Sequence, residues 1–117
     1  MKLIKRKEFL KLPSGVMYSE FYSTNVFSGL YIKKESLNND WCFESLTDQV
    51  KGSSLSEDIS EAVFDSISKK TSFELDLNRI QSNGDFENNQ FFAVYEKDDI
   101  DALLKKLMNI TDQYPKF

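Results

Sequence analysis

Residues Gln90–Ile110 read QFFAVYEKDDIDALLKKLMNI, and this stretch decides the fold that we expect for the chain. Phe91–Tyr95 is apolar on both faces, which predicts a strand that is covered on both sides and therefore central in its sheet. Asp98 has the short acceptor side chain of a helix N-cap. The apolar residues that follow have helical spacing: Ile100, Leu103, Leu104, Leu107 and Met108. Because a strand with two apolar faces needs cover, we expect this helix to pack directly on it.

The chain before this stretch alternates between short periodic segments and polar turns. Three alternating segments predict an antiparallel meander, and a fourth predicts a strand with one wet face. A run of apolar residues at helical spacing, with acids early and lysines late, predicts a long middle helix. A shorter helix is expected before Pro13. These segments are Lys5–Leu12 (helix), Val16–Tyr22, Leu30–Lys34 and Trp41–Leu46 (strands), Leu55–Lys70 (helix) and Thr71–Leu77 (strand).

Local signals mark several of the expected boundaries. Polar turns are predicted at Ser23–Asn25 and at Asn83–Gly84, the second of which is a strong hairpin signal. Ser54 lies three residues before Glu57, which is the spacing of a capping box. Ile80 and Phe86 are expected to hold the polar connector Asn78–Asn89 in place.

These elements predict one α+β domain that spans residues 1–117. Its core is a curled, mainly antiparallel sheet of about five strands, packed by two helices, with a short N-terminal helix. Closure of part of the sheet into a small barrel stays open at this point.

Composition and charge narrow the classes of function. The 117 residues are 40% hydrophobic and 29% charged, with a net charge of −4. Residues 1–11 carry five basic groups and one acid, whereas residues 12–117 carry ten basic and 18 acidic groups, a net of −8. The basic stretch is short, so we expect a solvated first helical turn, with Arg6 in water, and no direct nucleic-acid binding.

The same features predict a cytoplasmic protein. The chain has one cysteine and therefore no internal disulfide, which fits a reducing compartment. It has neither a run of about 18 apolar residues, as a membrane span needs, nor the apolar region of a signal peptide.

The residue types that support catalysis are scarce. The chain has no histidine, which excludes Ser-His and Cys-His nucleophilic systems and zinc sites built on imidazole. Cys42 lies within a predicted strand and reads as a core thiol. Asp98, Asp99 and Asp101 resemble a metal cluster, but their place at a helix start is explained by the helix dipole. We therefore predict no enzyme, no metal site and no cofactor.

Aromatic residues are the remaining signal for a binding site. Tyr18, Tyr22, Tyr31 and Trp41 all lie on the predicted N-terminal strands. On a shared outer face they would form a patch suited to a partner or ligand, and core packing explains them equally well. Arg79 is the candidate for binding an anion or carboxylate, with a local ion pair as the alternative.

Two parts of the chain resemble a known group of proteins. Lys7–Tyr18 reads KEFLKLPSGVMY, and Asn88–Leu104 reads NNQFFAVYEKDDIDALL. Both resemble small uncharacterised proteins of phages and prophage-bearing bacteria, which carry an F-x-x-L-P-x-G-x-x-Y start and a Q-x-F-x-V-Y-E-x-x-D ending. The resemblance covers both ends and leaves the middle third unmatched. It implies a small cytoplasmic accessory protein and brings no catalytic residues.

Four hypotheses of function follow from these observations, and the fourth and lowest-ranked is an enzyme that uses a metal-free carboxylate mechanism. The first is a non-enzymatic interaction module that binds another protein, and the second is a small-molecule or nucleotide binder that uses the sheet aromatics and Arg79. The third, an acidic mimic of nucleic acid, rests on the net charge of residues 12–117. A homodimer that pairs through Thr71–Leu77 as an edge strand is a further expectation.

Overall fold

The structure is a computed structural model that describes residues 1–23, 26–51, 56–82 and 90–117. The expected turns at residues 24–25 and 83–84, the expected Ser54 cap and Phe86 lie outside these ranges. Within them the chain forms six strands and three helices. In order they are β1 (Lys2–Lys5), α1 (Arg6–Leu10), β2 (Met17–Ser23), β3 (Val26–Leu37), β4 (Asp40–Ser45), α2 (Ser56–Lys69), β5 (Ile80–Ser82), β6 (Phe91–Val94) and α3 (Lys97–Asp112).

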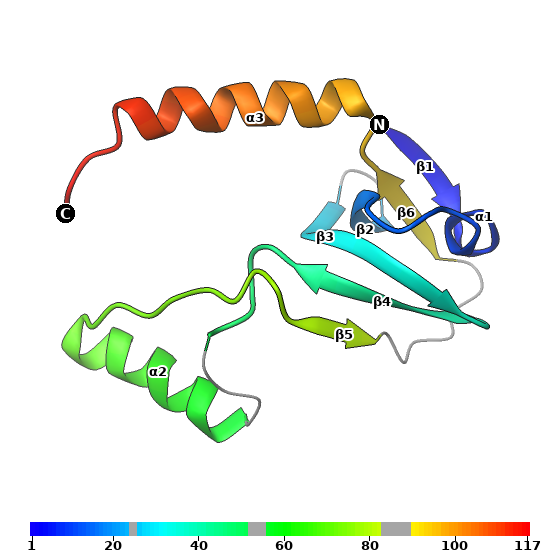
Figure 1. Ribbon diagram of the computed structural model, residues 1–117. Coiled ribbons are helices and arrows are strands. Elements are labelled where there is room, and N and C mark those ends of the chain that lie inside the picture. Colours follow the sequence, from blue (N-terminus) through cyan, green and yellow to red (C-terminus); the bar gives the residue numbers. More distant parts are fainter. Residues whose placement is uncertain (24–25, 52–55, 83–89) are drawn as a thin grey trace.

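The strands form one antiparallel sheet in the order β1-β6-β2-β3-β4-β5 (Figure 1). The predicted α+β class and curled antiparallel sheet are confirmed, with six strands where about five were expected, and the sheet stays open. β6 lies between β1 and β2, so that Ala93 is paired with Leu3 on one side and with Ser19 on the other. The prediction of a central strand at Phe91–Tyr95 is therefore confirmed.

The first strand was missed by the sequence analysis, which expected a solvated helical turn. Lys2–Lys5 instead pairs along β6 and closes that edge of the sheet. Lysines at both ends suit an edge strand, because charged side chains discourage pairing with another chain. Arg6, also expected in water, is only 3% exposed. Its guanidinium lies 4.9 Å from the centre of the Trp41 ring, and it donates a hydrogen bond to the Asn39 carbonyl.

The predicted strand at Thr71–Leu77 is wrong. Of its residues, only Leu75 makes a bridge, with Val50, and the free edge of β4 is paired with β5 instead. Phe73, Leu75 and Leu77, expected to face inward, are exposed, as is Ile80, expected to fix the connector. An alternating pattern shows that a segment can form a strand, but hydrogen bonding to a neighbour decides whether it does.

The core is a small aromatic cluster between α1 and the sheet. The Phe9 ring of α1 stacks on the Phe92 ring of β6 with their centroids 4.1 Å apart. Tyr18 and Trp41 meet Phe9 edge-on at 4.7 and 5.1 Å, and Trp41 Nε1–H donates a hydrogen bond of 2.8 Å to the Tyr18 hydroxyl. All four side chains are buried. Stacked and edge-to-face rings of this kind add about 0.5–1.5 kcal/mol per pair to the burial of apolar area.

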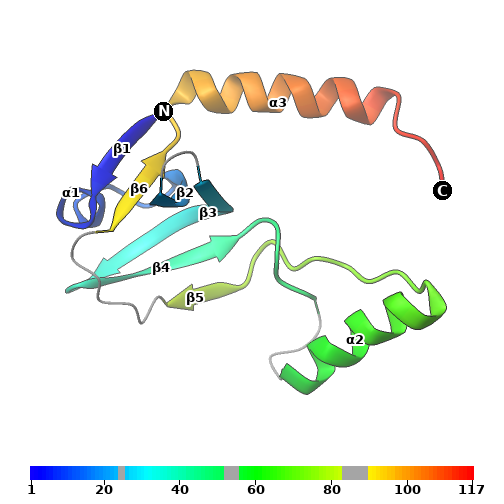
Figure 2. The same ribbon diagram turned by 180° about the vertical axis from the view of Figure 1, so that it is seen from behind.

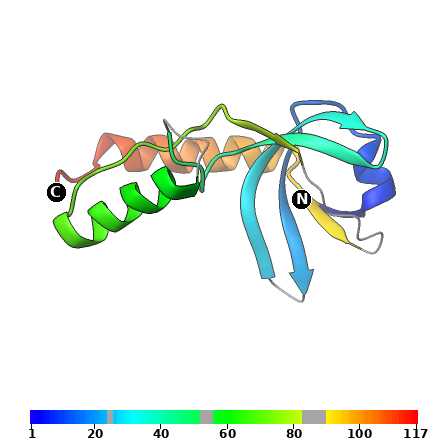
Figure 3. The same cartoon turned by 90° about the horizontal axis from the view of Figure 1, so that it is seen from below.

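The two long helices do not cover the sheet, so the expected packing is wrong on this point. α3 has no buried residue, and α2 and α3 project from the same side of the sheet (Figures 1 and 2). Seen from below, both helices extend away from the strands in the same direction (Figure 3). The cover of β6 comes from Phe9 of α1 instead. α3 also begins earlier than expected. Its N-cap is Glu96, in a capping box with Asp99, whereas the sequence predicted Asp98 as the N-cap.

Candidate functional site

The structure separates the five side chains that the sequence analysis singled out for binding. Tyr18 and Trp41 are core residues, almost fully removed from solvent. Tyr31 is half-buried, with its ring 5.3 Å from the ring of Tyr18 and 5.3 Å from that of Phe43. Tyr22, at 62% exposed, bonds to the carboxylate of its own strand neighbour Glu20. These aromatics do not share one outer face, and most of them hold the core together.

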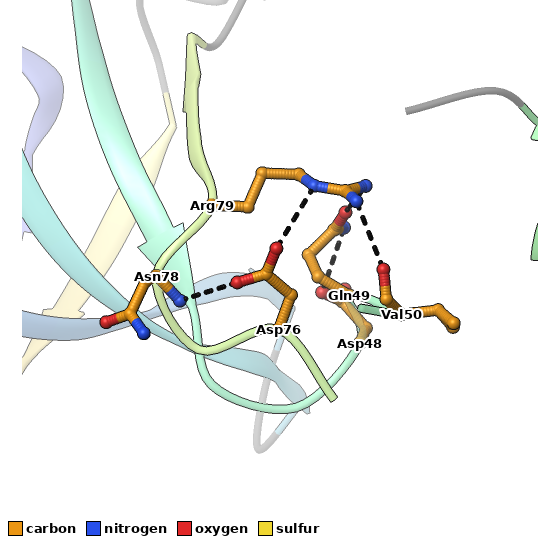
Figure 4. Close-up of polar contacts among 6 residues, drawn as sticks. All are labelled: Asp48, Gln49, Val50, Asp76, Asn78 and Arg79. Atoms are coloured by element: carbon orange, nitrogen blue, oxygen red, sulfur yellow. Dashed lines mark hydrogen bonds and ion pairs between the residues drawn. The ribbon is translucent and has the colours of Figure 1, made fainter. Parts of the chain in front are cut away.

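Arg79 lies apart from the aromatic cluster and ties two segments of backbone together. Its Nη2 donates to the Val50 carbonyl at 3.1 Å, and its Nη1 donates to Gln49 Oε1 at 3.3 Å. Its Nε lies 3.6 Å from an Asp76 carboxylate oxygen. Figure 4 shows the guanidinium turned toward residues 48–50. Arg79 precedes β5, and two strands separate β5 from the strand that carries Tyr18, so the two candidates form no common site.

Charge and burial shift the pKa of a few groups, none of them in a catalytic arrangement. Burial raises the pKa of the Tyr18 and Tyr31 hydroxyls above their ordinary value. Burial lowers the pKa of Lys33, whose Nζ donates to the Leu12 and Lys34 carbonyls at 2.8 and 3.1 Å. A hydrogen bond from the terminal amine lowers the pKa of Asp99. These shifts follow from packing and local pairing.

Two further features, a side-chain cluster for a metal ion and a membrane-spanning helix, are absent from the part of the chain that the structure describes. No group of three or more His, Cys, Asp or Glu side chains there is placed to hold a metal ion. Nor does any helix in those ranges combine the length and the apolar character needed to cross a membrane.

The most unusual surface of the molecule is the pair of unpacked helices. On α3 the apolar stripe faces solvent, with Leu104 55% exposed. On α2 the same holds, with Ile67 76% exposed. We call these two stripes together the helical faces. Their exposed members are Val63, Phe64 and Ile67 of α2 and Leu104, Leu107, Met108 and Ile110 of α3.

A third apolar segment lies beside the helical faces. Residues 70–79 return from the end of α2 toward β5, and in Figures 1 and 2 they run between the levels of α2 and α3. Phe73, Leu75 and Leu77 on this segment are exposed as well. Single exposed apolar residues are ordinary, whereas an amphipathic helix with its apolar side in solvent marks a site of contact. The helical faces, together with the exposed apolar residues of this segment, are therefore taken as the candidate site.

The sequence analysis identified the stripe on each helix but assigned both to the core. Its signal was the helical spacing of apolar residues, which shows that a face must be covered. The spacing carries no information on which surface covers it. The exposed side chain of Ile67 was therefore missed as part of a surface, although its periodicity was visible.

Comparisons with known proteins add no assignment. No family model, no curated protein and no solved structure matches this chain.

Proposed function

We propose that this protein is a non-enzymatic interaction module, and that it binds protein through the helical faces. The observation that carries the proposal is that two amphipathic helices extend from the sheet with their apolar sides in solvent. An amphipathic helix normally lays its apolar side against another element of protein structure. Here the chain's own sheet does not supply that element, because α1 already covers its core.

The shape of the site favours a protein partner over a small ligand. Small-molecule sites are concave and surround most of the ligand, with a few converging polar groups. The helical faces are apolar, and Leu104, Leu107 and Met108 of α3 have the i, i+3, i+4 spacing by which one helix packs on another. The alternative of a ligand bound by sheet aromatics and Arg79 has no shared pocket to support it, since those residues lie on separate parts of the sheet.

The cellular setting is part of the same proposal. The resemblance of both ends of the chain to phage and prophage proteins supports a small cytoplasmic accessory protein of that type. Such a protein would act by binding another polypeptide. That role requires an exposed binding surface and no catalytic residues.

Photo-crosslinking tests the proposal. A benzoylphenylalanine is placed at Leu104, on α3, and in a second variant at Leu37, at the end of β3. Both leucines are 55% exposed, and the β3–β4 hairpin lies away from α2 and α3 in Figure 1. We expect irradiation in cells that make the protein to give a defined polypeptide adduct from position 104 and little from position 37. Equal labelling at the two positions, or no polypeptide adduct at 104, contradicts the proposal.

A further inference from the structure

The exposed area of the chain is larger than a lone domain of this size should have. The accessible surface is 8810 Å² for 13.6 kDa, whereas a folded monomer of that mass exposes about 6,600 Å². The radius of gyration is 16.3 Å, against roughly 13.4 Å for a compact domain of this length. The excess, on the order of 2,200 Å² per chain, would give about 4,400 Å² in a symmetric pair, within the range of obligate homodimers.

From this and from the arrangement of the helices, we propose that a second copy of the chain covers the helical faces. The two copies form a two-fold dimer in which α2 of each copy packs antiparallel on α3 of the other. The result is a four-helix bundle with one sheet at each end. This inference rests on the proposed function, because it names the protein that the faces bind.

The direction of the helices permits this arrangement. Within one chain α2 and α3 run away from the sheet in the same direction, and they are separated from each other (Figures 1 and 2). A two-fold axis that passes near the middle of the helices, perpendicular to them, brings in two helices that run the opposite way. The 14 residues of α2 and the 16 of α3 span about 21 and 24 Å, so the two helices match in length. Antiparallel neighbours at this length are the usual geometry of four-helix bundles.

The order of charges along the helices favours the antiparallel pairing. On α2, Glu61 and Asp65 come before Lys69, and on α3, Asp101 comes before Lys105. In a parallel pair of α2 with α3, the acids of one helix would lie beside the acids of the other. In an antiparallel pair, each acidic part lies beside the lysines of the partner helix, which removes the repulsion and adds attraction.

The two edges of the sheet offer a poorer route to a dimer. β1 carries Lys2 and Lys5 at its ends, and β5 is three residues long. Short edge strands with lysines are the features that prevent pairing between sheets. The homodimer expected through Thr71–Leu77 does not have its strand, because that segment forms no ladder.

A second copy of the chain is also available to cover α3 whenever the chain is folded. Helices in proteins gain most of their stability from tertiary packing of an apolar face, and the 16 residues of α3 include none that is buried. It therefore needs its cover whenever the chain is folded. Another copy of the same chain is present at that moment and at the same concentration, whereas a different partner is not bound to be.

Sedimentation equilibrium of the full chain at about 1–100 μM gives the first test. We expect twice the 13.6 kDa mass of one chain. Leu107→Glu should weaken the dimer by about a hundredfold or more, because the symmetric interface loses an apolar contact twice and gains two charges. Leu37→Glu, on the sheet, should leave the mass unchanged. Emission from Trp41 in the core, unchanged in both variants, shows that the sheet stays folded.

Charge exchange gives the second test, and it is specific for the antiparallel α2–α3 pairing. One variant carries Glu61→Lys with Asp65→Lys, and the other carries Lys105→Glu with Lys106→Glu. Each alone puts like charges against like and should dimerise at least tenfold more weakly than the wild type. Mixed together they restore both pairs, so we expect a heterodimer to form.

The outcomes separate this inference from the proposed function. A wild-type monomer over the whole concentration range overturns the dimer, and the function still stands if position 104 gives an adduct with another protein in cells. A wild-type dimer whose charge variants neither weaken nor recover in the mixture overturns the α2–α3 pairing. The absence of any polypeptide adduct at position 104 removes the function itself.

Discussion

Replacing Tyr18 by phenylalanine removes a single oxygen atom from the centre of the aromatic cluster. That hydroxyl accepts the hydrogen bond of 2.8 Å from Trp41 Nε1–H, and the bond is buried. Phenylalanine fills the same space, so the change leaves the packing of the rings in place. What it leaves behind is an indole N–H without its acceptor, in a region that water does not reach.

The expected cost follows from that unpaired donor. A buried polar group that loses its partner costs about 1–3 kcal/mol, considerably more than the net value of an ordinary hydrogen bond. Small domains have about 5–15 kcal/mol of stability in total, so the loss is a sizeable fraction of it. With a denaturant slope of about 2 kcal/mol per molar, the urea midpoint should fall by roughly 0.5–1.5 M.

Urea unfolding measures this directly, since Trp41 is the only tryptophan and reports from the site itself. Wild type and variant are compared at one fixed chain concentration, because association adds to apparent stability. Tyr22→Phe is the matched control: it removes the hydroxyl of an exposed tyrosine on the same strand, and it should change stability by less than about 0.5 kcal/mol.

A double-mutant cycle isolates the hydrogen bond. In a Trp41→Phe background no indole N–H remains, so the added change at Tyr18 should cost much less than in the wild type, as followed by far-UV circular dichroism. If Tyr18→Phe is as mild as Tyr22→Phe, or equally costly in both backgrounds, then the buried bond does not stabilise the core as argued.

Three further substitutions test other parts of the structure. Gly29→Ala should destabilise the sheet by about 2 kcal/mol or more, measured by urea unfolding, because φ is +72° and the added Cβ would meet the Tyr31 ring. Arg79→Lys should lose the paired hydrogen bonds to the Val50 carbonyl and the Gln49 side chain at a cost of about 1 kcal/mol, with faster hydrogen exchange across residues 73–77. Burial lowers the pKa of Lys33 in the folded chain, so the Lys33 ammonium holds its proton more tightly in the unfolded chain. The stability of the fold should therefore rise as the pH rises toward 10.5, and Lys33→Met should flatten that rise.

Two of these substitutions have a matched control variant, and the third has an outcome that would contradict it. Gly15→Ala also places alanine at positive φ, but its Cβ would meet no atom within 4 Å, so it should cost less than the change at Gly29. If both alanine substitutions lower the stability equally, the contact between the added Cβ at residue 29 and the Tyr31 ring is not what destabilises Gly29→Ala. Lys7→Met, at an exposed lysine, should leave the alkaline slope unchanged, and an equal flattening there would show that Lys33 is not its source. Unchanged exchange at residues 73–77 in the Arg79 variant would mean that this arginine does not anchor the segment.

Elements that depend on local patterns were predicted correctly, whereas elements that depend on contacts between distant parts of the chain were not. β6 and α3 were found because two apolar faces over Phe91–Val94 and helical spacing beyond Asp98 are local patterns. α2 and the three strands of the meander were found for the same reason. Thr71–Leu77 has an equally clean alternation and is not a ladder strand, since β5 holds the edge that it would have used. Lys2–Lys5 shows the reverse, a strand that forms because β6 offers it a neighbour.

The candidate site was harder to predict from the sequence than the fold, because it depends more on contacts between distant parts of the chain. The aromatics Tyr18 and Trp41 were equally compatible with a patch and with a core, and only the arrival of Phe9 from α1 decided for the core. The helical faces were visible as stripes in the sequence, but a stripe has the same spacing whether it lies against its own sheet or against another chain.

By itself, then, the sequence determined an acidic α+β chain without histidine, with a central apolar strand, and with two amphipathic helices. It could do so because propensity and periodicity act over a few neighbouring residues. The tertiary structure alone decided that a five-residue helix covers the core and that the two long helices remain uncovered. Cover is a matter of which surfaces meet across the fold, and their meeting depends on turns and strand order that no local pattern encodes.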